Sequence, residues 1–186
     1  MSARIAGALS FGKESLMTTI LKGNIVSAPE LGKLEVTENG YLIAEDGVIT
    51  GVYPVLPEQY AGAAVEDYRD ALIVQSFADM HLHAPQYPML GMGMDRPLLD
   101  WLNAYAFPTE ARFADPDYAR TVYRQLAREL AARGTTRVCM FSSLHTDATL
   151  ILMEELEQAG ITGYVGKVNM DRNAATGVLE ETTEES

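Results

Sequence analysis

Cysteine is nearly absent from this sequence of 186 residues, which contains a single one, Cys139. A lone cysteine has no partner in the chain, so a disulfide framework of the kind that stabilises small secreted domains is excluded. Cys139 lies in an apolar segment, where cysteine usually acts as a small buried hydrophobic side chain. We therefore expect a protein of a reducing compartment, the cytoplasm.

Basic residues are also scarce, because 14 lysines and arginines stand against 26 aspartates and glutamates and give a formal net charge of -12. Nucleic acids and anionic membrane surfaces attract basic patches, so neither is an expected partner. No apolar run approaches the length of a membrane helix. The first residues lack the apolar core of a secretory signal. The sequence therefore predicts no nucleic-acid partner and no membrane partner.

Histidine is rare too, yet two of the three histidines, His81 and His83, stand one residue apart. They follow an apolar run, Ala71–Val74, that is typical of a buried strand. Side chains of a strand alternate faces, so both imidazoles and Asp79 are expected on one side. Two converging imidazoles form half of a first-row metal site, and such a pair accepts zinc, iron, nickel or manganese. Two histidines on the wet face of a hairpin are the alternative interpretation.

The stretch Phe77–Phe113, FADMHLHAPQYPMLGMGMDRPLLDWLNAYAFPTEARF, resembles the guanine deaminases of the amidohydrolase superfamily. Its most specific parts are HAPQY at 83–87, LDWLN at 99–103 and FPTEARF at 107–113. Shorter similarities follow at 134–136, 145–147, 166–168 and 181–186, and similarity is weak before about residue 65. One departure is visible, since the family often has Pro-Gly where this chain has Gln75-Ser76.

This resemblance implies a zinc enzyme that deaminates guanine by hydrolysis and releases xanthine and ammonia. It implies that His81 and His83 are the first two zinc ligands. It also implies a substrate-contact loop made of His83, Ala84, Pro85 and Gln86. An amide suits the contact of Gln86 with a purine because it offers both a donor and an acceptor.

Other candidate residues have weaker support. His145 matches no metal ligand of the family, so we interpret it as a structural residue or one that supports the site indirectly. Trp101 and Phe107 are suited to stack on a planar base, although core packing explains them equally well or better. Met89, Met92 and Met94 lie in the loop after the histidines and are suited to line an adaptable pocket, although plain packing is the simpler interpretation.

Residues 1–68 are predicted to form a β-sandwich segment. Thr18–Ser27 is rich in β-branched residues, and Tyr41–Glu45 and Val48–Val52 flank Asp46-Gly47, a strong hairpin signal. The resemblance implies that strands from elsewhere in the protein complete this composite sandwich. A self-contained β-domain is the alternative, although the segment is small for one.

Residues 69–186 alternate between strands and helices, which favours an α/β fold of parallel βαβ units. A helix is expected from Asp115-Pro116 to Gly134, and strands are expected at Thr135–Phe141 and Thr162–Met170 around a helix at about Ala148–Ala159. The order of elements also allows an open doubly wound sheet. The resemblance favours the N-terminal part of a (β/α)8 TIM-like barrel, in which chemistry gathers at the carboxyl ends of the strands.

The resemblance places the family's remaining ligands and its proton-shuttling glutamate beyond Ser186, so no catalytic residue is expected within this chain. We therefore expect an incomplete barrel that binds guanine but is inactive alone, with a complementing C-terminal half or a homodimer as partner. Two alternatives stay open. One is a non-catalytic fragment that pairs with other proteins through its open sheet edge, and the other is an amidohydrolase that acts on another aminated heterocycle.

Overall fold

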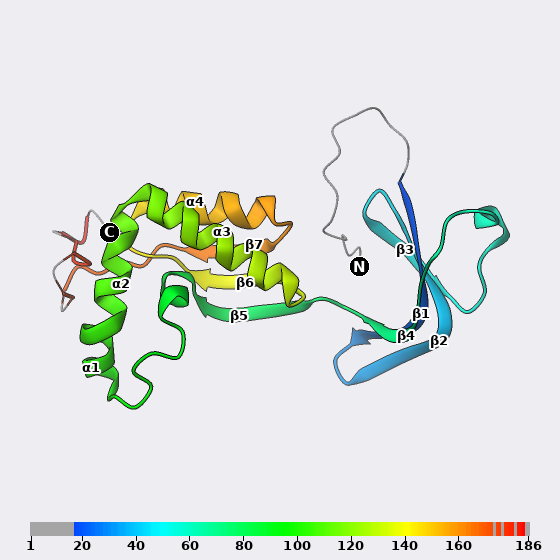
Figure 1. The fold of residues 1–186 in the computed structure, drawn as a ribbon, viewed down its shortest axis with the longest axis horizontal. Coiled ribbons are helices and arrows are strands. Elements are labelled where there is room, and N and C mark those ends of the chain that lie inside the picture. Colours follow the sequence, from blue (N-terminus) through cyan, green and yellow to red (C-terminus); the bar gives the residue numbers. More distant parts are fainter. Residues whose placement is uncertain (1–16, 173, 176, 181, 185–186) are drawn as a thin grey trace. The chain divides into compact units, whose positions relative to one another are not determined.

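The computed structural model describes residues 17–172, 174–175, 177–180 and 182–184, so the acidic motif at 181–186 lies partly outside the described residues. The chain divides into two compact units, Met1–Gln75 and Ser76–Ser186 (Figure 1). The boundary lies a few residues beyond the one expected from the sequence. A β-sheet dominates the first unit, whereas strands alternate with helices in the second.

The first unit is built on four strands. They are β1 (Thr18–Glu30), β2 (Lys33–Glu45), β3 (Val48–Tyr53) and β4 (Glu66–Val74), with a short 3-10 helix at Glu58–Tyr60. Their order in the sheet is β3-β2-β1-β4, in which β1 runs antiparallel to β2 and parallel to β4. Only a few apolar side chains are deeply buried among the described residues of this sheet, namely Ile20, Ile25, Leu42, Ile43 and Ala44.

The hairpin predicted around Asp46-Gly47 is confirmed. Asp46 has φ 50° and Gly47 has φ 76°, which is the pair of left-handed residues that a tight two-residue turn requires. The Asp46 carboxylate also accepts a hydrogen bond from the N–H of Met17 at 3.0 Å. This turn fixes the register of β2 against β3.

The apolar run Ala71–Val74 does not continue into the histidine strand, so that part of the prediction is wrong. The run belongs to β4 in the first sheet, whereas β5 (Phe77–His83) starts a second sheet. The two residues between them are bound to different sheets. The Gln75 side chain accepts a hydrogen bond from the backbone of β1 at 3.1 Å, and the Ser76 hydroxyl accepts one from Thr136 at 2.6 Å. The strand is broken because its two ends pair with different partners.

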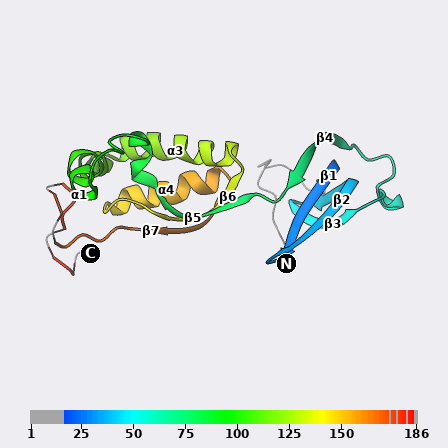
Figure 2. The same cartoon turned by 90° about the horizontal axis from the view of Figure 1, so that it is seen from below.

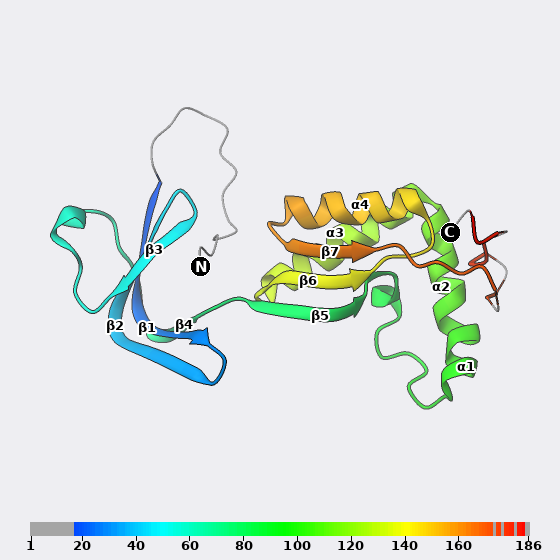
Figure 3. The same ribbon diagram turned by 180° about the vertical axis from the view of Figure 1, so that it is seen from behind.

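The second sheet contains β5, β6 (Thr135–Phe141) and β7 (Thr162–Gly166), all parallel and in that order. The connections carry α3 (Pro116–Ala132) and α4 (Thr146–Gln158). Both helices lie on one face of the sheet (Figure 2), and Figure 3 shows the strands in front of α3. The predicted parallel βαβ units are confirmed, although β7 ends earlier than expected.

Pairing of β6 with β7 depends on the absence of a side chain at Gly163. A Cβ atom placed there would lie 1.8 Å from the carbonyl oxygen of Val138, far inside van der Waals contact. At Gly166, by contrast, a Cβ would meet Phe141 at 3.8 Å, an ordinary contact. The packing of the sheet therefore requires glycine at the first position and tolerates a methyl group at the second.

Helix α3 begins at the predicted residue. The Asp115 side chain accepts hydrogen bonds from the backbone N–H groups of Asp117 at 2.9 Å and Tyr118 at 3.4 Å, and Pro116 occupies the first helical position, where it needs no N–H. The core beneath the helices joins α3, α4 and β6. Its buried members include Ala119, Tyr123, Leu126, Ala127, Val138, Met140, Leu152 and Leu156.

Glu155 links α4 to α3. Its side chain is 2% exposed and accepts hydrogen bonds from Arg120 Nη1 and from Arg124 Nε and Nη2, each at 3.0 Å. The hydrogen bonds from Arg124, followed by those from Arg120, hold the pKa of Glu155 below its usual value against the opposing effect of burial. A buried carboxylate is tolerated here because it is paired with cations.

The segment between β5 and α3 begins with the stretch predicted as a loop after the histidines and is largely helical. It is a succession of short helical pieces: a 3-10 helix η2 (Ala84–Met89), α1 (Leu98–Trp101), a π-helical turn (Leu102–Ala106), α2 (Phe107–Ala111) and a 3-10 turn (Arg112–Ala114). The indole N–H of Trp101 donates to the carbonyl oxygen of Met92 at 2.9 Å and ties the intervening loop to α1.

Across the described part of the chain, no helix is long and apolar enough to span a membrane.

Candidate functional site

Strand β5 carries both histidines of the predicted site and contains a bulge beside them. Asp79 pairs with Val138, and Leu82 pairs with Met140. Between these two pairs, β5 has two residues where β6 has one. The Asp79 carboxylate accepts a hydrogen bond from the backbone N–H of His81 at 3.1 Å. Bulges re-aim side chains and are common next to active sites. The bulge interrupts the strict alternation that the sequence predicts for this strand.

The rings of His81 and His83 lie side by side, with centroids 5.2 Å apart. Phe141, at the end of β6, contacts both, with its ring 6.1 Å from His81 and 5.0 Å from His83. Partial burial, followed by the neighbouring His81, lowers the pKa of His83. A lowered pKa favours the neutral imidazole, which is the form that binds metal ions.

These two imidazoles fit two positions of a metal site. Catalytic zinc is typically held by three protein ligands and a water, and the described residues contain no cluster of three or more histidine, cysteine, aspartate or glutamate side chains. The described part of the chain therefore offers a pair of ligands rather than a complete set. His145 does not join this pair.

The strand is not buried as predicted. Phe77 is 60% and Met80 is 67% exposed, because the helices cover only the opposite face of this sheet. On the uncovered face, a hollow of about 300 Å³ includes His81 and Phe141 in its lining, together with Cys139 and Tyr164. The histidines thus stand at the end of an accessible, largely apolar surface.

The predicted substrate loop follows directly as η2. Ala84 and Pro85 are buried, so their side chains support the loop rather than face a ligand. The Gln86 side chain donates a hydrogen bond from Nε2 to Oε1 of Glu110 at 3.1 Å. Glu110, on α2, is 8% exposed, and burial raises its pKa while the bond from Gln86 opposes that shift.

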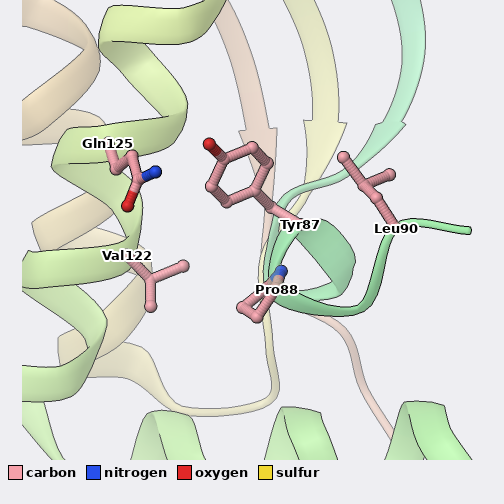
Figure 4. A pocket seen from close by; sticks show the side chains of 5 residues that line it. All are labelled: Tyr87, Pro88, Leu90, Val122 and Gln125. Carbon is pink, nitrogen blue, oxygen red and sulfur yellow. The ribbon is translucent and has the colours of Figure 1, made fainter. Parts of the chain in front are cut away.

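The residues that follow Gln86 face α3. Tyr87, Pro88 and Leu90 form one wall of a hollow of about 350 Å³, and Val122 and Gln125 of α3 form the other (Figure 4). The Tyr87 ring also packs against the core. The residues after Gln86 therefore pack against the helical layer.

The end of β6 leads into a buried polar cluster that the sequence did not predict. Ser142 and Ser143 are fully buried, and the Tyr123 hydroxyl forms a hydrogen bond with Ser142 Oγ at 3.2 Å. Burial raises the pKa of Tyr123 to about 12. This phenol therefore stays protonated at neutral pH, and the cluster serves to fix the end of β6.

His145 occupies the N-cap position of α4 beyond these serines, without a capping hydrogen bond from its side chain. Its Nε2 atom is buried and has no hydrogen-bond partner among the residues that the structure describes. Burial, followed by Lys167, lowers its pKa, and Glu180 acts in the opposite direction. The Lys167 ammonium group pairs with Glu180 and donates to Asn169 Oδ1 at 3.0 Å. A neutral imidazole is favoured at this position.

Comparison with known proteins gives the family. A model of the amidohydrolase family matches residues 72–186, which is more than half of the chain. The chain belongs to the amidohydrolase family. The predicted resemblance is thereby confirmed at the level of this family of metal-dependent hydrolases.

Several amidohydrolases similar to this chain are guanine deaminases. The chain is 33% identical to guanine deaminase of Dictyostelium discoideum over 191 aligned positions, which cover 94% of this chain and 42% of that protein. It is 50% identical to guanine deaminase of Rattus norvegicus over 108 residues, which cover 58% of this chain and 24% of that protein. These alignments therefore cover less than half the length of either relative.

A solved structure shows the same arrangement. Guanine deaminase of C. acetobutylicum, determined with guanine bound in its active site, matches with a TM-score of 0.82 and 42% sequence identity. The match covers 88% of this chain and 39% of that chain. The mixed α/β fold predicted from the sequence is thus confirmed as an amidohydrolase fold.

One residue that sequence reasoning missed in this amidohydrolase is Glu110. It stands within the quoted motif at 107–113, but its role depends on Gln86, which is 24 residues away in the chain. One signal was available: Ala106, Glu110 and Phe113 follow the spacing of one helical face, and the first and last are apolar. A charged residue on an apolar stripe indicates a buried carboxylate with a specific partner.

Proposed function

We propose that this chain is the N-terminal part of a guanine deaminase, a zinc-dependent hydrolase that converts guanine and water to xanthine and ammonia. The observation that carries the proposal is the grouping of His81, His83 and Gln86 at the end of β5, in a chain whose similar relatives are guanine deaminases. In the reaction the bond between C2 and the exocyclic nitrogen breaks, a bond from C2 to a water oxygen forms, and the amine leaves as ammonia.

Each residue has a defined part in this proposal. His81 and His83 would hold the zinc ion through neutral imidazoles, which the lowered pKa of His83 favours. When bound, the ion supplies a water whose pKa falls to about 7. Phe141 packs against both rings and restricts their movement. Gln86 orients the purine, whereas Ala84 and Pro85, being buried, would contact it through their backbone only.

The architecture proposed around this site is a (β/α)8 barrel to which β5, β6 and β7 contribute three neighbouring strands. The uncovered sheet face would then be the barrel interior. The proposed domains are a composite β-sandwich segment that includes β4 and ends at Gln75, and the first βα units from Ser76 onward. The other metal ligands would come from a complementing C-terminal half, so the chain alone would bind zinc weakly.

Ammonia release tests this proposal. The purified chain with zinc and guanine should show no detectable turnover, whereas co-expression with the remaining part of the C. acetobutylicum guanine deaminase should restore it. In the restored complex, His81→Ala should abolish turnover. Robust deamination by the lone chain would contradict the proposal that a C-terminal half supplies the other metal ligands. A restored complex that prefers adenine, cytosine or a triazine to guanine would contradict the proposed substrate.

A second candidate is a non-catalytic protein that pairs with another copy or a longer relative. The exposed apolar side chains of the uncovered face favour it, among them Phe77, Met80 and Tyr164, since such surfaces mark contacts with other proteins. Light scattering coupled to size-exclusion chromatography separates the two cases. A well-behaved monomer at micromolar concentration would count against the pairing role.

A further inference from the structure

Glu110 is an unusual residue in the core of the second unit. It lies on α2, between the buried apolar residues Ala106 and Phe113 of the flanking turns, and is 8% exposed. Carboxylates are rarely buried to this extent unless they are paired. Among the residues that the structure describes, Glu110 forms no ion pair, and the hydrogen bond it accepts comes from Gln86 Nε2 at 3.1 Å.

The contribution of this carboxylate to stability does not explain its presence. Burial disfavours the charged form and raises the pKa of Glu110, and one hydrogen bond from a neutral amide returns only part of the desolvation cost. An apolar side chain of similar volume would fill the same space without that cost. Glu155 shows the contrast, because two arginines compensate its burial.

What Glu110 does control is the orientation of the Gln86 amide. An amide presents a donor at one end and an acceptor at the other, and an ionised carboxylate can only accept. The NH2 group of Gln86 must therefore face Glu110, which turns the carbonyl oxygen Oε1 away from it. Without this partner, the two ends of the amide could exchange places at little cost.

We propose that Glu110 is a positioning residue that fixes the polarity of Gln86 and thereby makes the site select guanine over adenine. This inference rests on the proposed function. Guanine carries a hydrogen on ring nitrogen N1, which can donate to the outward carbonyl oxygen of Gln86. Adenine carries a lone pair at N1, so two acceptors would face each other and neither would be satisfied. Sites that leave buried polar groups unpaired in this way discriminate strongly against the wrong substrate.

The decisive variant is Glu110→Gln, which preserves the shape of the side chain but can donate as well as accept. It frees the Gln86 amide to turn. In the restored complex described above, the ratio of kcat/KM for guanine to kcat/KM for adenine should fall at least about tenfold. A defect of folding alone would lower both rates and leave their ratio unchanged. Glu157→Gln, the same chemical change at an exposed position on α4, is the matched control and should leave the ratio unchanged.

A second readout on the purified chain needs no substrate. The side-chain NH2 hydrogens of Gln86, observed by NMR, should exchange slowly with water in the original chain and fast in Glu110→Gln. Glu110→Asp, which keeps the charge but withdraws the oxygen from the amide, should give the same loss of protection. Circular dichroism of each variant shows whether it is folded.

The outcomes separate the two proposals. An unchanged guanine-to-adenine ratio in a folded Glu110→Gln complex that turns over guanine overturns the positioning role. Fast exchange of the Gln86 amide in the original chain overturns it as well. A complex that never turns over guanine, combined with a Gln86 amide whose protection depends on Glu110, overturns the proposed substrate and supports the fixed amide.

Discussion

The two faces of the β5–β6–β7 sheet differ in what covers them. On one face, Val138 and Met140 are buried beneath α3 and α4. On the other, Tyr164 is 79% exposed and Phe141, which touches both histidines, is 42% exposed. The covered face therefore carries the stability of the unit, and the open face carries the candidate site. Substitutions on the two faces should accordingly separate effects on folding from effects on binding.

The largest expected difference between the faces concerns Leu152 of α4, which is fully buried. Leu152→Ala should lower the free energy of unfolding by about 2–5 kcal/mol, because it removes packed methyl groups and leaves a cavity. Met80→Ala on the open face should change it by at most about 0.5 kcal/mol. Urea denaturation followed by circular dichroism measures both. Equal losses for the two variants would show that the open face is covered in solution.

A smaller effect is expected where the strands meet. Gly163→Ala should destabilise the chain by about 1–3 kcal/mol, because a Cβ would collide with the Val138 carbonyl and force β6 and β7 apart. Gly166→Ala, which meets only an ordinary contact, is the control and should lie within about 1 kcal/mol of the original chain. The same denaturation experiment applies. Similar unfolding midpoints for the two variants would argue against the close approach at Gly163.

The smallest expected effect comes from the ionic contact between the helices. The pKa of Glu155 is lower in the folded chain than its ordinary value. The contribution of Glu155 to the free energy of unfolding is therefore complete above the ordinary glutamate pKa of about 4.3. This contribution is lost as the pH falls from that value through the lower pKa of the folded chain. Glu155→Gln should cost about 1–2 kcal/mol at pH 7.

The difference between Glu155→Gln and the original chain should shrink between about pH 5 and the acid limit of folding. Glu157→Gln, the same change at an exposed carboxylate of α4, is the control for a general charge effect. If Glu155→Gln lowered the free energy of unfolding by the same amount down to the lowest pH at which the chain folds, the ionisation of Glu155 would not stabilise the folded chain.

Local signals were sufficient for much of this fold. The strand Thr135–Phe141 and the start of α3 at Asp115-Pro116 appear where the sequence predicts them, because β-branched runs and a proline after a capping residue act within a few neighbours. The break at Gln75-Ser76 was not predictable from such signals. It is determined by pairing with two different sheets, which only the folded chain reveals.

The candidate site likewise has one feature that the sequence predicts and two that it does not. The adjacency of His81 and His83 follows from their spacing, since residues two apart in a strand are near neighbours. The bulge beside them and the bond from Gln86 to Glu110 could not be read from the sequence. Both depend on residues that only the tertiary structure brings together.

The sequential strand order of the second sheet has a consequence for how the chain is made. Each strand pairs with the one before it, so β6 finds β5 already synthesised, and β7 finds β6. Domains fold as the ribosome delivers them, N-terminal parts first. The part of this protein that bears His81 and His83 can thus assemble during translation, before the ribosome has finished the chain.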